Sequence, residues 1–123
     1  MILVDTSVWI DHLRAGNEML RRLLDRGLVL GHPFVTGELA LGNLRQREMI
    51  LAALAALPQA SLASDGEVLH FIEEHALYGF GIGYVDAHLL AAARLMPGAT
   101  LWTRDTRLRS AATRLDLAMA SPG

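Results

Sequence analysis

Cysteine is absent from the 123 residues of this sequence, and its absence removes several kinds of chemistry. Without thiols the chain has no disulfide, no thiolate nucleophile and no cysteine-based zinc site. Any metal ion must therefore be held by oxygen atoms or by imidazole nitrogens.

Lysine is absent as well, so all eleven basic residues are arginines. Mechanisms that need a lysine are excluded, which removes P-loop nucleotide hydrolases and receiver domains. The net charge of −2 argues against a protein that grips nucleic acid through a broad cationic surface. Each cation nevertheless offers the planar guanidinium fork that suits phosphate.

Long hydrophobic runs are also missing, although 52% of the residues are hydrophobic. Each apolar run is broken by charge or glycine before it reaches the ~20 residues that a membrane-spanning helix needs. The first residues carry neither a basic leader nor a signal-peptide pattern. We therefore expect a cytoplasmic protein without membrane contact, folded as a single domain over residues 1–123.

Short apolar segments alternate with helical patterns along the chain, which is typical of a parallel sheet covered by helices. Strands are expected at residues 1–4, 28–30, 61–63 and 99–103, with a final edge strand at 117–119. Helices are expected after Thr6 and at residues 17–26, 33–41, 46–57, 64–77, 84–95 and 106–114. The pattern predicts an α/β fold, a three-layer α/β/α sandwich around a short parallel sheet of four or five strands.

Acidic residues stand where the expected strands and helices meet one edge of the sheet. Asp5 and Asp105 each follow an apolar strand directly, so a parallel sheet brings both to its carboxyl edge. Glu38 and Asp86 each lie in the early part of an expected helix, which places them at that edge if the helices begin there. Two like charges at ~4 Å repel by roughly 4 kcal/mol at an effective dielectric constant of 20. The cluster therefore predicts a bound cation.

Oxygen ligands favour Mg²⁺, with Mn²⁺ as a substitute, over zinc or copper. Such an ion lowers the pKa of water to give a nucleophile and offsets the charge that develops on a phosphoryl oxygen. Arg104 and Arg107 follow the last expected strand and are candidates to contact phosphate. The acids thus predict hydrolysis of a phosphodiester by metal-activated water, which leaves a 5′-phosphate and forms no covalent enzyme intermediate.

Four segments carry a more specific signal. They are VDTSVW at residues 4–9, VTGEL at 35–39 with Gly42, YVDAHLLAAA at 84–93 and LWTRD at 101–105. In this order they resemble the PIN-domain ribonucleases, and among them the VapC toxins of type II bacterial toxin-antitoxin systems. The resemblance covers essentially the whole chain. It implies an α/β/α sandwich, Mg²⁺-dependent cleavage of single-stranded regions of RNA, a homodimer and inhibition by a cognate antitoxin protein.

The resemblance also assigns roles to individual residues. The positions that match the family's catalytic and metal-binding acids are Asp5, Glu38, Asp86 and Asp105. Of these, Asp5 and Asp86 are the expected direct ligands. The hydroxyl positions that would orient carboxylates or waters are Thr6, Ser7 and Thr103.

Other functions stay open at the level of sequence. A phosphatase with a strand-end aspartate usually has a lysine and a second acid two residues later, where this chain has Ser7. A catalytically silent module that only binds an antitoxin would also account for the fold, although all four acids are present. Single-stranded DNA is a further candidate substrate, because attack by water on phosphorus needs no 2′-hydroxyl.

Three further features have more ordinary interpretations. The five histidines, at positions 12, 32, 70, 75 and 88, show no metal-ligand spacing and are expected on the surface or in the packing. The glycines at 79, 81 and 83 predict a mobile loop at the rim of the site. The alanine- and leucine-rich helices at 39–57 are candidates for the dimer or antitoxin interface.

Overall fold

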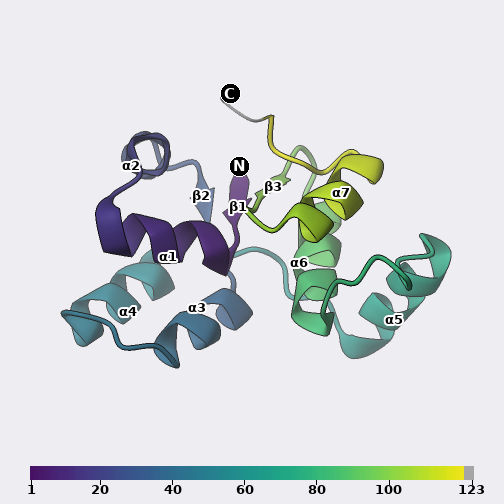
Figure 1. Ribbon diagram of the computed structural model, residues 1–123, viewed down its shortest axis with the longest axis horizontal. Coiled ribbons are helices and arrows are strands. Elements are labelled where there is room, and N and C mark those ends of the chain that lie inside the picture. The colour runs from purple at the N-terminus through teal and green to yellow at the C-terminus, as the bar shows by residue number, and fades with distance from the viewer. Residues whose placement is uncertain (121–123) are drawn as a thin grey trace.

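The computed structural model describes residues 1–120 and consists of short strands that alternate with helices (Figure 1). Residues 121–123, the end of the expected single domain, lie outside this description. The strands are β1 (Ile2–Val4), β2 (Val29–Leu30) and β3 (Thr100–Trp102). The helices are α1 (Thr6–Ala15), α2 (Glu18–Asp25), α3 (Pro33–Ala40), α4 (Arg47–Ala56), α5 (Asp65–Glu74), α6 (Tyr84–Leu95) and α7 (Thr106–Arg114). None of these helices has both the length and the apolar character that a transmembrane span requires.

The three strands form a parallel sheet in the order β2-β1-β3, with β1 in the centre. Leu3 pairs with Leu30 on one side and with Leu101 on the other. Because all three strands run in the same direction, their carboxyl ends meet at one edge of the sheet. Asp5 follows β1 at this edge, next to the residues that follow β3.

The prediction of four or five strands is wrong, because residues 61–63 and 117–119 do not extend the sheet. Beside β2 there is a single bridge, between Gly31 and Gln59, and beside β3 a single bridge between Leu101 and Ala118. Pro58 can accept a hydrogen bond from Gly31 N but has no N–H to continue a ladder. The Gln59 side chain donates to Leu54 O and Leu57 O, which ties the segment to the end of α4 instead of the sheet.

Several helices begin where the sequence predicts them. Asn17 Oδ1 accepts a hydrogen bond from Leu20 N at 2.9 Å and caps α2. Ser64 and Glu67 form a reciprocal capping box at the start of α5, with bonds of 3.1 and 2.9 Å. Pro33 occupies the first position of α3, where the N–H that it lacks would have no helical partner.

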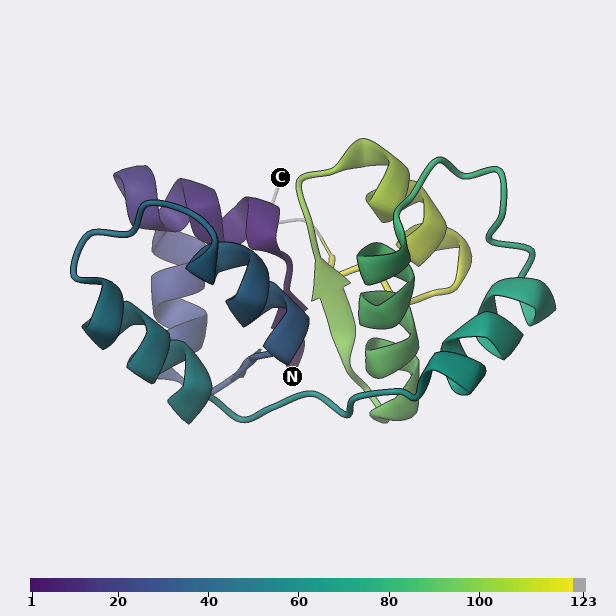
Figure 2. The same ribbon diagram turned by 90° about the horizontal axis from the view of Figure 1, so that it is seen from below.

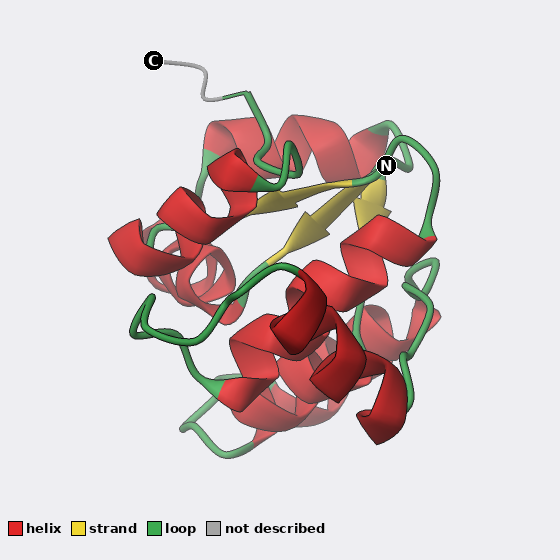
Figure 3. Cartoon of the chain, turned by 90° about the vertical axis from the view of Figure 1, so that its right-hand side faces the viewer, coloured by secondary structure: helices red, strands yellow, loops and turns green. Residues whose placement is uncertain are grey.

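Helices cover both faces of the sheet, as the predicted sandwich requires. Viewed from the side, the strands lie between helices above and below them (Figure 3). Helices α1 to α4 gather beside β2, and α5 to α7 gather beside β3, in two perpendicular views (Figures 1 and 2). The segment between α4 and α5 connects the two groups along one edge of the molecule (Figure 2).

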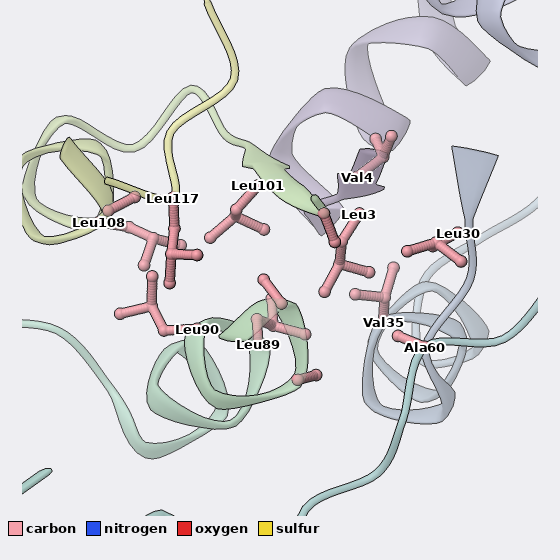
Figure 4. Close-up of a cluster of buried hydrophobic side chains, with 14 of the residues drawn as sticks. Leu3, Val4, Leu30, Val35, Ala60, Leu89, Leu90, Leu101, Leu108 and Leu117 are labelled. Atoms are coloured by element: carbon pink, nitrogen blue, oxygen red, sulfur yellow. The ribbon is translucent and has the colours of Figure 1, made fainter. Parts of the chain in front are cut away.

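The core lies where the strand side chains meet α6 (Figure 4). Leu3 and Leu101 are 0% and 2% exposed, and they face Leu89 and Leu90, each 0% exposed. Full burial of a side chain of this size contributes about 1.5–3 kcal/mol. Helix α6 buries every residue from 87 to 93 and is therefore held firmly against the sheet. This packing fixes the position of the first turn of α6, which carries Asp86.

Candidate active site

Asp5 is held between β1 and β3 at the carboxyl edge of the sheet. Its side chain is buried, with 6% of the residue exposed. Its Oδ2 atom accepts hydrogen bonds from Ser7 Oγ and from Thr103 Oγ1, both at 2.8 Å. Its backbone N–H donates to Trp102 O at 2.9 Å, which extends the pairing of β1 with β3 by one residue. Asp5 is thus fixed by two hydroxyl groups from opposite ends of the chain.

Asp105 joins the same network through Thr103. The backbone N–H of Asp105 donates to Thr103 Oγ1 at 3.0 Å, and Thr103 is 3% exposed. Asp105 Oδ1 accepts from Arg107 N and Leu108 N at 2.9 and 3.0 Å and so caps α7. Asp105 therefore caps a helix, as aspartates after a strand commonly do. Thr103 links it to Asp5 through hydrogen bonds to both residues.

Glu38 reaches the site differently from the way the sequence suggests. It is not in the early part of its helix, because α3 begins at Pro33 and Glu38 lies near its end, before Ala40. An exposed hydrogen bond of 2.7 Å from Thr6 Oγ1 to Glu38 Oε1 connects it to the first residue of α1. Since Thr6 follows Asp5 directly, this bond draws Glu38 toward the carboxyl edge of β1.

Asp86 lies in the first turn of α6, as predicted, and faces the other three acids. Burial raises its pKa, the N–H of Gly83, 3.1 Å from Oδ2, opposes that rise, and the negative charges of Asp5, Asp105 and Glu38 raise the pKa further. Because the charges of three carboxylates act on the fourth, the predicted acids lie close enough to influence one another's ionisation. The acids come from β1, α3, α6 and the residue before α7.

The donor set of this site fits a hard divalent cation. Among residues 1–120, no three histidine, aspartate or glutamate side chains are grouped tightly enough to hold one metal ion directly. Mg²⁺ does not need such a group, because it commonly takes one or two carboxylates and keeps several water ligands. Burial is the main cause of the raised pKa of Asp86, and the charges of Asp5, Asp105 and Glu38 add a repulsion that a cation would relieve. The site therefore suits Mg²⁺ because its acids offer only oxygen ligands and bring several negative charges together.

Two predicted arginines flank the acids in different ways. Arg104 Nε lies 2.7 Å from Asp11 Oδ2, and its backbone N–H donates to Ser7 Oγ at 3.0 Å. Arg107 extends from the first turn of α7 across the backbone of Gly81. The sequence analysis did not anticipate Asp11, which lies one helical turn after Ser7 in α1. That i, i+4 spacing is the signal that would have found it.

Two buried histidines lie between the helices that carry Glu38 and Asp86. His32 is 0% exposed, and its Nδ1 accepts from Phe34 N at 3.0 Å to cap α3. His88 is 1% exposed, and the Phe34 ring lies 5.1 Å from the His32 ring and 4.7 Å from the His88 ring. Burial, reinforced by the nearby His88, lowers the pKa of His32 to about 4. Both histidines therefore pack in the interior between these helices.

Comparisons with known proteins agree with this geometry. The sequence profile of the PIN domain matches residues 2–113, a range that includes all four acids. The chain is 48% identical over 120 residues to Ribonuclease VapC32 from two strains of Mycobacterium tuberculosis, covering 98% of this chain and 97% of the relative. The crystal structure of FitAcB from Neisseria gonorrhoeae contains a similar fold, with a TM-score of 0.65 and 25% identity. That match covers 99% of this chain and 98% of the other.

Proposed function

This chain belongs to the PIN-domain family as a VapC-type ribonuclease, and from that premise we propose how its site works. In this proposal it is the toxin of a type II toxin-antitoxin system and hydrolyses single-stranded regions of RNA with the help of a divalent metal ion. The observation that carries the proposal is the convergence of four acids at one edge of the sheet, where hydrogen bonds link Asp5 and Asp105 through Thr103 and hold Glu38 and Asp86 at Thr6 and Gly83. A cluster of this kind is stabilised by a cation and attracts phosphate once the cation is bound.

Asp5 and Asp86 are the proposed direct ligands of Mg²⁺ or Mn²⁺, and Glu38 and Asp105 complete the site. A bound divalent cation lowers the pKa of water and offsets the negative charge that develops on the phosphoryl oxygens. Ser7 and Thr103 both donate to Asp5 Oδ2, so they hold the carboxylate in one orientation. Thr6 does the same for Glu38 through Oε1.

The arginines complete the proposed site from the side of the substrate. Arg104 and Arg107 are proposed to contact RNA phosphates, because a guanidinium can bind two phosphate oxygens at once. Asp11 holds Arg104 at 2.7 Å and so limits the orientations of its guanidinium before RNA arrives. Attack by water on phosphorus with cleavage of the P–O3′ bond leaves a 5′-phosphate and a 3′-hydroxyl, whereas a 2′,3′-cyclic phosphate would require attack by the RNA 2′-hydroxyl.

The first test is cleavage of a set of structured RNAs by the wild type and by Asp5→Asn, each with Mg²⁺, Mn²⁺ or EDTA. We expect cutting that needs metal, leaves 5′-phosphate ends and is lost in the variant. Asp25→Asn, on the exposed end of α2, removes the same charge far from the acids and is the matched control. Cleavage that survives EDTA or Asp5→Asn, or that yields 2′,3′-cyclic phosphate, would contradict the proposal.

A protein partner is part of the same proposal, and the candidate surface lies on α3 and α4. Leu41, directly after α3, is 90% exposed and Met49 in α4 is 57% exposed, while Leu54 is the one buried residue of α4. An apolar surface of this kind suits a cognate antitoxin or a second copy of the chain. Light scattering of the free protein and co-purification with the antitoxin test the two interactions. Met49→Asp is expected to weaken whichever interaction uses this surface.

A further inference from the structure

An open depression of about 420 Å³ lies between the loop before α6 and the first turns of α7. Its lining residues are Gly79, Phe80, Thr106, Arg107 and Ser110. Thr106 and Arg107 directly follow Asp105, and Gly79 and Phe80 belong to the loop that leads to Asp86, so both sides of the depression are close in sequence to acids of the site.

Polar groups from one face of α7 point to the kind of ligand that fits. Thr106 and Ser110 are one helical turn apart, and Arg107 and Ser110 are spaced i, i+3, so the three share a face of the helix. They supply two hydroxyl groups and one guanidinium, which together match a sugar-phosphate backbone. The depression offers no carboxylate among its lining residues.

Arg107 differs from the nearby arginines because its guanidinium has no partner in the described chain. Arg104 pairs with Asp11, Arg109 donates to Thr103 O, and Arg114 donates to His75 O while lying 5.0 Å from the Phe80 ring centroid. Within residues 1–120, the guanidinium of Arg107 forms neither an ion pair nor a hydrogen bond. Of these four arginines it is the one whose guanidinium has no such partner in the described chain.

Gly81 determines where the side chain of Arg107 lies. Gly81 has a φ of 76°, and a Cβ atom there would lie 2.9 Å from Arg107 Nη1 and 3.1 Å from its Cδ. The arginine therefore rests directly on the backbone of the 79–83 loop, and a Cβ at residue 81 would require its guanidinium to shift. A side chain that is already confined loses less conformational freedom when it binds a ligand.

We propose that this depression is a subsite for the nucleotide next to the scissile phosphate of a single-stranded RNA. Arg107 binds the phosphate of that nucleotide, the hydroxyls of Thr106 and Ser110 bind its sugar-phosphate backbone, and Gly81 is a positioning residue for Arg107. The assignment rests on the proposed function, because the acids define where the scissile phosphate lies. Single-stranded RNA suits an open depression, since its backbone is flexible enough to follow the rim.

The test separates binding from cleavage. Binding of a fluorescent single-stranded RNA is measured in EDTA over a range of salt concentrations, and cleavage is measured separately with Mg²⁺. Arg107→Gln is expected to weaken binding about 5- to 10-fold and to lower the slope of log affinity against log salt by roughly 0.7, the value for one phosphate contact on a single strand. In cleavage it raises KM by a similar factor and leaves kcat within about twofold, because the contact is made before and during the reaction.

Gly81→Ala provides the second variant, and Gly98→Ala is its matched control. Gly98 has a φ of 77°, nearly that of Gly81, but a Cβ there has nothing within 4 Å, and it precedes β3 at the opposite edge of the sheet. Both alanines strain the backbone alike, but only Gly81→Ala displaces Arg107. We expect Gly81→Ala to raise KM in the direction of Arg107→Gln, and Gly98→Ala and the exposed Arg26→Gln to keep the wild-type KM.

The outcomes are distinct. Wild-type affinity, salt slope and KM in Arg107→Gln would overturn the subsite even if the enzyme cleaves RNA as proposed. A KM in Gly81→Ala equal to that in Gly98→Ala would overturn the positioning role of Gly81. If the wild type cleaves no RNA, the proposed function fails, and the binding measurements in EDTA still decide whether this depression holds single-stranded RNA.

Discussion

Thr103 Oγ1 donates a hydrogen bond of 2.8 Å to Asp5 Oδ2 and thereby joins residues 98 positions apart in the sequence. The same hydroxyl accepts from Asp105 N at 3.0 Å, so one buried side chain holds both strand-end acids of the site. The parallel pairing of β1 with β3 makes this contact possible, because Val4 and Trp102 are partners in the register. The two acids are therefore as rigid as the sheet that carries them.

Replacing Thr103 with valine tests this arrangement. Thr103→Val removes one of the two donors to the buried Asp5 Oδ2 and the acceptor of the partly buried Asp105 N–H, which costs about 1–3 kcal/mol of unfolding free energy. We also expect cleavage to slow by on the order of tenfold or more, because a small displacement of a catalytic group has effects of that size. Thr100→Val, at the start of the strand that precedes Thr103, is the control. A Thr103→Val enzyme with the wild-type kcat would show that the hydroxyl does not position the acids.

Neutralising Asp86 is expected to stabilise the protein in EDTA. Burial and three neighbouring carboxylates raise the pKa of Asp86, so its negative charge is unfavourable in the folded state. Asp86→Asn removes that charge and keeps an oxygen acceptor for Gly83 N, so its Tm should exceed that of the wild type. Glu73→Gln, on the exposed side of α5, removes one charge elsewhere. A Tm below that of the wild type would show that repulsion at this site is weak.

Divalent metal should reverse this order of stability. A cation that binds only the folded state stabilises it by an amount that grows with the logarithm of the cation concentration above Kd, and the Tm rises accordingly. We expect Mg²⁺ and Mn²⁺ to raise the Tm of the wild type and to leave that of Asp86→Asn nearly constant, as measured by calorimetry across a metal titration. Equal increases in both proteins would place the stabilising metal away from Asp86.

The buried His32 predicts a fall in stability at acid pH. Its pKa drops from 6.5 to about 4 on folding, so its contribution to stability is complete above pH 6.5 and is lost between pH 6.5 and 4. The loss is on the order of 3 kcal/mol, since each pKa unit corresponds to about 1.4 kcal/mol. The charged or titratable group that acts on His32 is His88. The exposed Asp65 lies next to His88, with its Oδ1 3.5 Å from His88 Nε2.

His32→Asn provides the comparison, because an asparagine can still cap α3 but does not titrate. Its unfolding free energy, measured by urea at several pH values, should fall less between pH 6.5 and 4 than that of the wild type. His70→Asn changes an exposed histidine on α5 and should follow the wild-type curve. Identical pH dependence in His32→Asn and the wild type would contradict the role of His32.

The capping box of α5 predicts a purely structural effect. Ser64→Ala removes the oxygen that accepts from Glu67 N and should cost about 1 kcal/mol of stability. The midpoint of urea unfolding should fall while its slope stays unchanged, since the surface exposed on unfolding is the same. Ser61→Ala, at an exposed position before the helix, should leave the midpoint in place. Matching midpoints for the two variants would show that the cap contributes little.

Local sequence was sufficient to predict features that depend on neighbouring residues. The bounds of α6 and α7 follow from apolar periodicity and match residues 84–95 and 106–114. Asn17 and Ser64 cap their helices as their spacing to later backbone groups indicates. The placement of Asp5 and Asp105 at one edge follows because each directly ends an apolar strand and parallel strands share their carboxyl edge.

Long-range contacts decided what the sequence did not. Whether residues 61–63 form a strand depends on hydrogen-bond partners at the edge of the sheet, and Pro58 and Gln59 direct that segment to the end of α4. Glu38 joins the site near the end of α3 because Thr6 is placed next to it by packing. Asp11 reaches Arg104, and Arg107 crosses Gly81, only because α1, α7 and the 79–83 loop meet in space.

The division has a physical cause. The sequence by itself determined the types of element, their caps and the set of acids, because these depend on backbone and side-chain groups a few residues apart. The tertiary structure alone decided the number of strands and the partners of the acids and arginines. Those choices are made between segments tens of residues apart, by which side chains happen to lie within about 3 Å of one another once the core has packed.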